Sequence, residues 1–178
     1  MPLIHTVTPE NATGQVAETY AQIKAAFGFI PNAIQLDSIN PAHMARHWAG
    51  IQDAVGHKTL SGELFTTIRL LASEIEHCEY CIGLNAGMLM QMHGRSVEEI
   101  AAIKADPAAA PLNAKEKALL VYVTKILKDS NSGTADDIAA LHAAGADDRE
   151  IFDALTHGAG QIASDIILNA FKVDPDMH

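Results

Sequence analysis

Apolar residues recur through most of this chain at intervals of three and four positions, the spacing that places them on one face of an α-helix. The clearest examples lie in residues 9–27, 41–55, 61–75 and 148–171. No stretch shows the sustained two-residue alternation of a half-buried β-strand. The pattern therefore predicts an all-α chain.

Helix-capping signals precede these segments and divide the chain further. Thr8-Pro9, Asn40-Pro41 and Ser61 each offer an N-cap residue before an apolar segment. Other predicted starts have the capping-box spacing, in which an acidic side chain three residues later can reach back to the cap. These pairs are Ser96–Glu99, Asn113–Glu116, Asp147–Glu150 and, in a weaker form, Thr134–Asp137. Together the signals predict a bundle of about eight helices.

The predicted helices fall into an N-terminal half, residues 1–104, and a C-terminal half, residues 113–172, joined by a linker at 105–112. Neither half is expected to bury its apolar surface alone, so residues 1–178 are predicted to form a single domain. The last helix, about 148–171, is apolar on more than one face and contains Gly158 and Gly160, which permit another helix to approach closely. This composition favours a homo-oligomer.

Charge and composition exclude several classes of partner. The chain has 12 basic and 22 acidic residues, for a net charge of −10, and it has no basic stripe. Nucleic-acid binding and attraction to anionic lipid are therefore not expected. The N-terminus lacks the basic and apolar features of a signal peptide, and no apolar run is long enough to span a membrane. We expect a cytoplasmic protein.

The segment HCEYCIGLN, residues 77–85, contains both cysteines of the chain, Cys78 and Cys81. Two cysteines in a reducing compartment argue against a permanent structural disulfide, which leaves a redox-active pair, half of a metal site, or two buried thiols. Residues three apart lie on the same face of a helix. If a helix begins at this pair, its unpaired N–H groups and dipole favour the thiolate.

Metal and cofactor binding are less well supported by the sequence. A structural zinc site needs four ligands, and neither a second C-x-x-C nor a closely spaced histidine pair follows the cysteines. Covalent haem attachment requires histidine after the second cysteine, where Ile82 stands. His43 and His47 lie one turn apart, which could suit a metal, but an ordinary helix face is favoured. No metal and no cofactor are therefore predicted.

LSGELFTTIRLLASEIEHCEYCIGLN, residues 60–85, resembles the core of the carboxymuconolactone decarboxylase family, in its alkylhydroperoxidase D-like branch. The shared features are the Leu60-Ser61 helix start, Ser73 five residues before the first cysteine, and the C-x-x-C motif. GFIPNAIQ, residues 28–35, and the last helix extend the resemblance over nearly the whole chain.

The resemblance implies an all-α, alkylhydroperoxidase D-like fold that assembles as a trimer or hexamer. It also implies that Cys81 attacks a hydroperoxide and that Cys78 resolves the product to a disulfide, which a dithiol reductant then reduces.

Two positions depart from the family's peroxidase motif. That motif has a glutamate twelve residues before the first cysteine and a histidine four residues after the second, and here Thr66 and Asn85 occupy these positions. The nearby carboxylates are expected to disfavour a thiolate, which a protonated His77 could partly offset. Glu74, one turn before Cys78, could serve as a substitute base. The predicted catalytic residues are therefore Cys81, Cys78, His77 and Glu74.

These observations favour a peroxidase-type or thiol–disulfide oxidoreductase with an atypical proton relay. The alternative is a family member without peroxidase activity that acts as a small-molecule binding or oligomeric scaffold protein. Lactone decarboxylation ranks last, because a cysteine pair is not what that reaction needs.

Overall fold

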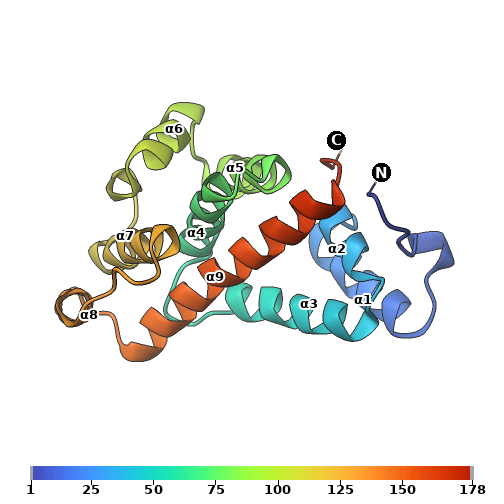
Figure 1. The fold of residues 1–178 in the computed structure, drawn as a ribbon, viewed down its shortest axis with the longest axis horizontal. Coiled ribbons are helices and arrows are strands. Elements are labelled where there is room, and N and C mark those ends of the chain that lie inside the picture. Colours follow the sequence, from blue (N-terminus) through green and yellow to red (C-terminus); the bar gives the residue numbers. More distant parts are fainter. Residues whose placement is uncertain (1, 177–178) are drawn as a thin grey trace. The chain divides into compact units, whose positions relative to one another are not determined.

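The computed structural model describes residues 2–176, and this part of the chain contains helices and no strand (Figure 1). The predicted all-α class is therefore confirmed. The elements are η1 (Pro9–Asn11), α1 (Gly14–Phe27), α2 (Asn32–Asp37), α3 (Pro41–Val55), α4 (Gly62–Ile75), α5 (Glu79–His93), α6 (Val97–Ala105), η2 (Pro107–Ala109), α7 (Ala114–Lys128), α8 (Ala135–Ala143) and α9 (Asp148–Phe171). The α-helix that the sequence pattern did not predict is α2, whose six residues are too few to display a helical period.

The described chain forms two compact units. One comprises the residues up to Gly56 and those from Ile167 onward, and the other comprises residues 57–166. The predicted linker, residues 105–112, lies inside the second unit, where η2 packs against α6 and α7. The single-domain expectation stays a prediction.

Helices α1, α2 and α3 build the first unit around one apolar cluster. Its buried members are Val16, Tyr20, Ile23, Ile34, Met44 and Trp48. Two hydrogen bonds satisfy polar groups at the edge of the cluster: the Trp48 indole N–H donates to Gln22 Oε1 (2.9 Å) and the Tyr20 hydroxyl donates to the Val7 carbonyl (2.7 Å). Buried aromatic residues with such polar partners add apolar contact area without leaving a donor unpaired.

Helix α4 lies at the centre of the second unit. It packs against α5 and α7, and nine of its 14 residues are buried. Gly158 of α9 allows that helix to pack closely as well, because a Cβ atom there would lie 2.9 Å from Val123 Cγ1 and 3.1 Å from Ile68 Cγ2. The predicted close approach at this glycine is therefore confirmed, whereas a Cβ atom at Gly160 would meet no atom within 4 Å.

Most predicted helix starts are present, with two corrections. Asn40 and Ser61 accept the expected N-cap hydrogen bonds. Ser96–Glu99, Thr134–Asp137 and Asp147–Glu150 each form both bonds of a capping box. The prediction at Thr8-Pro9 is wrong, because these residues begin only a 3₁₀ turn and the α-helix starts at Gly14. Asn113 caps α7, but the Glu116 carboxylate accepts from the Ser61 backbone N–H (2.6 Å) instead of closing a capping box.

None of the helices in residues 2–176 combines the length and apolar character that crossing a membrane requires.

Candidate functional site

The cysteine pair lies where α5 begins, as the sequence predicts. Helix α4 ends at Ile75, and His77 takes a left-handed backbone conformation (φ 52°). The Cys78 N–H then donates to the Ser73 carbonyl (3.0 Å) and the His77 N–H to the Glu74 carbonyl (3.4 Å), which is the pairing of a Schellman helix end. Cys78 becomes the N-cap of α5 and Cys81 lies in its first turn.

Both cysteines are free thiols and both are buried, with 1% of Cys78 and 3% of Cys81 exposed. A third group joins them from α9: the two sulfur atoms and a carboxylate oxygen of Asp165 lie within 4.8 Å of one another. The Asp165 side chain is fully buried. The sequence analysis did not include this carboxylate in the site.

Only one of the two carboxylate oxygens of Asp165 has hydrogen-bond partners among the described residues. Its Oδ1 accepts from Gln161 Nε2 (2.7 Å) and lies 3.2 Å from Ser73 Oγ, while its buried Oδ2 has no hydrogen-bond partner among the described residues. Burial raises the pKa of Asp165, and the hydrogen bonds only partly counter that effect. Such a carboxyl group can take up and release a proton nearer neutral pH than an exposed aspartate can.

The two thiols differ in acidity. A hydrogen bond from the Cys81 thiol lowers the pKa of Cys78, which also lies at the positive end of the α5 dipole. The pKa of Cys81 is raised, first because its thiol donates that hydrogen bond and then because it is buried. Asp165 raises the pKa of both thiols when it is ionised. These opposite shifts favour Cys78 as the first of the two thiols to lose its proton.

Thr66 and Asn85, the residues in the family's relay positions, are connected by Arg69. The Arg69 guanidinium donates to Asn85 Oδ1 (2.8 Å) and Thr66 Oγ1 (3.0 Å), and Asn85 Nδ2 donates to the Cys81 carbonyl (2.9 Å). Burial lowers the pKa of Arg69 to about 10, and an ionised Cys81 would counter that effect, so Arg69 remains positively charged at neutral pH. The positively charged Arg69 side chain thus lies between the two positions at which the family's motif has its proton-relay residues.

His157 completes this hydrogen-bond network from α9. Its Nε2 lies 3.1 Å from Arg69 Nη1 and must accept, because arginine only donates. Its ring also packs edge-to-face on Phe65, with 4.8 Å between centroids. Burial, followed by the Arg69 charge, lowers the pKa of His157 to about 3, which keeps the ring neutral.

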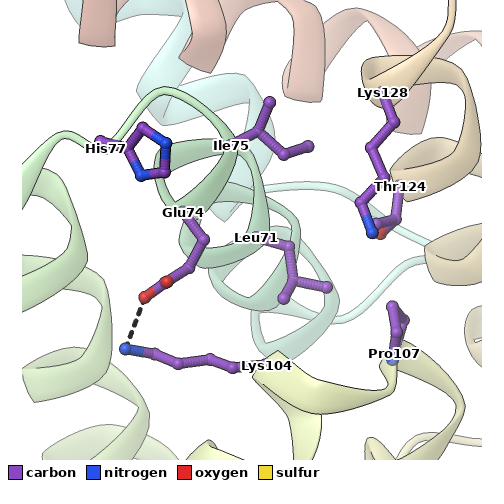
Figure 2. Close-up of a pocket in the computed structure, with 8 residues that line it drawn as sticks. All are labelled: Leu71, Glu74, Ile75, His77, Lys104, Pro107, Thr124 and Lys128. Carbon is purple, nitrogen blue, oxygen red and sulfur yellow. Dashed lines mark ion pairs between the residues drawn. The ribbon is translucent and has the colours of Figure 1, made fainter.

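The other two predicted site residues, Glu74 and His77, line a shallow surface pocket of about 220 Å³ (Figure 2). There the Glu74 carboxylate pairs with Lys104 Nζ (2.5 Å), and the His77 side chain is exposed. The structure brings Cys78 and Cys81 together and pairs Glu74 with a lysine. A catalytic role for Glu74 or His77 stays a prediction.

Two polar stripes along α4 and α9 carried a signal that the sequence analysis missed. His157, Gln161 and Asp165 recur every four residues on the mostly apolar last helix, and Arg69 and Ser73 do so on α4. Residues four apart share a helix face, so polar side chains at this spacing within apolar segments indicate a buried network rather than a solvated surface. The hydrogen bonds between these stripes position Asp165 beside the thiols.

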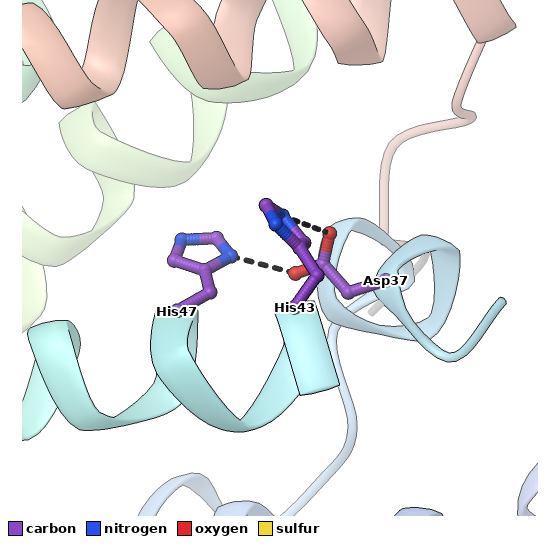
Figure 3. A group of neighbouring side chains, drawn as sticks. All are labelled: Asp37, His43 and His47. Atoms are coloured by element: carbon purple, nitrogen blue, oxygen red, sulfur yellow. Dashed lines mark hydrogen bonds and ion pairs between the residues drawn. The ribbon is translucent and has the colours of Figure 1, made fainter. Parts of the chain in front are cut away.

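Two groups in the described residues have the composition of metal ligands: Cys78, Cys81 and Asp165 in the second unit, and Asp37, His43 and His47 in the first. In the first unit, Asp37 Oδ2 lies 2.6 Å from His47 Nδ1 and Oδ1 lies 3.5 Å from His43 Nε2 (Figure 3). Asp37 ends α2, and the two histidines lie one turn apart near the start of α3.

Solved structures share this fold. An uncharacterized peroxidase-related protein from Silicibacter sp. TM1040 superimposes with a TM-score of 0.80 at 20% identity, over 98% of this chain and 89% of its own. A peroxidase-related protein from Ralstonia eutropha JMP134, described as an alkylhydroperoxidase AhpD core, gives 0.76 at 18% identity, over 97% and 94%. A protein of unknown function from Agrobacterium tumefaciens, named as a candidate AhpD-type antioxidant defence protein, gives 0.64 at 20% identity, over 80% and 97%.

The chain has the AhpD-like fold. No protein-family model and no curated protein matches its sequence, so the likeness is one of structure. At such identities the likeness establishes the fold and leaves the chemistry to the residues of the site.

Proposed function

We propose that this protein is a thiol-dependent oxidoreductase that reduces hydroperoxides, with Cys78 and Cys81 as the redox pair and Asp165 as the proton carrier. The observation that supports the proposal is the group of two reduced thiols and one buried carboxylate within 4.8 Å. The peroxidase-related names of proteins with the same fold agree with it.

The proposed reaction begins when one thiol gives its proton to Asp165. The resulting thiolate attacks the terminal oxygen of the hydroperoxide, an S–O bond forms and the O–O bond breaks. The departing alkoxide takes the proton back from Asp165 and leaves as the alcohol. The second sulfur then attacks the sulfenic sulfur, an S–S bond forms, and water leaves. An external dithiol supplies the two electrons and two protons that restore both thiols.

The family resemblance and the thiol pKa values favour different cysteines as the attacking sulfur. The resemblance implies that Cys81 attacks, whereas the lowered pKa of Cys78 and the raised pKa of Cys81 favour Cys78 as the first thiolate. Cys78→Ser and Cys81→Ser, each treated with peroxide and a sulfenic-acid trap, distinguish the two. The variant that still forms the trapped adduct retains the attacking sulfur.

The experiment that tests the proposal counts thiols before and after one equivalent of an organic hydroperoxide in the folded protein. We expect both thiols to disappear together and to return with a dithiol reductant, and we expect Cys78→Ser/Cys81→Ser to show no turnover. If both thiols persist with excess peroxide while the protein stays folded, the proposal is wrong.

The burial of both sulfurs favours a second candidate, a binding or scaffold protein without peroxidase activity. A hydroperoxide cannot reach sulfurs that are 1% and 3% exposed unless the site opens. Persistence of both thiols would support this candidate. Under either candidate function we propose that the protein forms a homo-oligomer, a trimer or a hexamer. Exposed apolar side chains such as Phe152 and Val121 are consistent with such an assembly.

A further inference from the structure

The geometry of Asp37, His43 and His47 points to a binding site for one divalent first-row transition metal ion, separate from the thiol site and independent of the proposed function. Figure 3 shows both imidazole rings directed toward the same carboxylate. The three ligand atoms lie within 4.8 Å of one another.

The distances distinguish this group from a simple hydrogen-bonded pair. His47 Nδ1, at 2.6 Å from Oδ2, already provides Asp37 with a close partner. His43 Nε2, at 3.5 Å from Oδ1, is too far for a good hydrogen bond but within ligand reach. Metal–ligand bonds of about 2.0–2.1 Å hold tetrahedral ligands about 3.4 Å apart, which small side-chain rotations would achieve here.

The backbone around the three residues is fixed without an ion. The Asn40 N–H donates to the Asp37 carbonyl (2.9 Å), and the His43 N–H donates to the Asn40 side chain (3.1 Å). These bonds fix the turn that joins α2 to α3, so an ion would not have to order it. Ligands held in place before binding lose less conformational entropy when the ion binds.

Charge and access also suit a cation. The group offers two imidazole nitrogens and one carboxylate, and no lysine or arginine pairs with Asp37 among residues 2–176. The side chains of His43, His47 and Asp37 are 46%, 34% and 10% exposed, so an ion can enter and water can fill its remaining positions. Nitrogen ligands disfavour Mg²⁺ and Ca²⁺, and two histidines with one carboxylate suit Zn²⁺, Fe²⁺ or Co²⁺.

The test is a titration of chelator-treated full-length protein with Zn²⁺, followed by calorimetry, and with Co²⁺, followed by its visible spectrum. We expect one ion per chain and a higher melting temperature with Zn²⁺. Each of His43→Ala, His47→Ala and Asp37→Asn should weaken binding by about 100-fold or more, since loss of an outer-shell partner alone costs about 10–100-fold. If His43→Ala or His47→Ala does not fold, His43→Gln or His47→Asn, respectively, is tested in its place.

Two controls make the result decisive. His142 also pairs with one aspartate, Asp148, at 2.7 Å, but without a second histidine, so His142→Ala should leave Zn²⁺ affinity unchanged. Cys78→Ser/Cys81→Ser should also bind Zn²⁺ as the parent protein does. A sulfur-to-cobalt charge-transfer band, loss of binding in the cysteine variant, or equal binding by all the His43, His47 and Asp37 variants would overturn the proposal.

Discussion

The two carboxylate-centred groups of this protein have similar sizes and opposite surroundings. Asp165 and two thiols lie in the buried interior, whereas Asp37 and two imidazoles lie at a surface that is partly open to water. Burial destabilises an unpaired charge, so Asp165 and the thiols are suited to exchanging protons. Solvent access allows an ion to enter and leave, so Asp37 and the histidines are suited to binding one. The surroundings, more than the ligand types, separate the two chemistries.

Substitution of Asp165 and of Asp37, one at a time, should give the largest difference between the two groups, and the difference should appear in peroxidase turnover. Asp165→Asn removes the proposed proton carrier and should lower peroxidase turnover by about 10²–10⁴-fold, the usual contribution of a general acid or base. Asp37→Asn should leave turnover unchanged. Steady-state rates with a supplied dithiol measure both variants, and equal losses in the two would remove the distinction between the groups.

The same Asp165→Asn variant should be more stable than the parent protein at neutral pH. The folded pKa of Asp165 is raised, so the folded chain binds more protons there than the unfolded chain, and stability falls as the pH rises above the ordinary aspartate pKa of 3.8. The substitution removes that loss, which urea unfolding at several pH values would detect. A variant that is less stable at neutral pH would contradict the raised pKa.

Acid should destabilise the buried network through His157. Its folded pKa of about 3 lies below the ordinary 6.5, so between these two pH values His157 is protonated in the unfolded chain and neutral in the folded chain. Stability is then fully present above pH 6.5 and is lost as the pH falls toward 3, by up to about 5 kcal/mol. His157→Gln, which keeps an acceptor for Arg69, should flatten this loss in urea titrations, and an unchanged pH dependence would show that His157 is not its source.

A pair of glycine substitutions tests whether close helix packing positions the buried group. Gly158→Ala places a Cβ atom against Val123 and Ile68 and should destabilise the fold by about 1–3 kcal/mol. Gly160→Ala meets open space and should stabilise the helix by about 0.5–1 kcal/mol. Thermal melting compares the two, and Gly158 lies two turns before Asp165 on the same face, so only its substitution should also reduce turnover.

The smallest expected effect is the change in stability on substitution of His77, which precedes Cys78 in the chain. His77→Gly relieves a left-handed conformation and should raise stability by about 1 kcal/mol with turnover kept. His77→Ala removes the ring without relieving the backbone and serves as the matched control. If both variants lose turnover by an order of magnitude, the imidazole takes part in the reaction, as the sequence analysis predicts.

Local sequence signals determined the helices and the position of the cysteine pair. Helical spacing and caps such as Asn40 and Ser61 depend on interactions within a few residues, so one sequence is enough to predict them. The errors at Thr8-Pro9 and Glu116 have the same physical explanation, because a short-range signal cannot show where the rest of the fold directs a backbone or a carboxylate.

Only the tertiary structure decided which side chains share a site. Asp165 lies 84 residues after Cys81 and Asn85 lies 16 residues after Arg69, and helix packing rather than chain proximity brings each pair together. The sequence therefore determined most of the helices, their order and the two cysteines at the start of one of them. Packing decided that a buried aspartate lies beside them, because contacts between helices depend on how whole faces fit and are not encoded within any one segment.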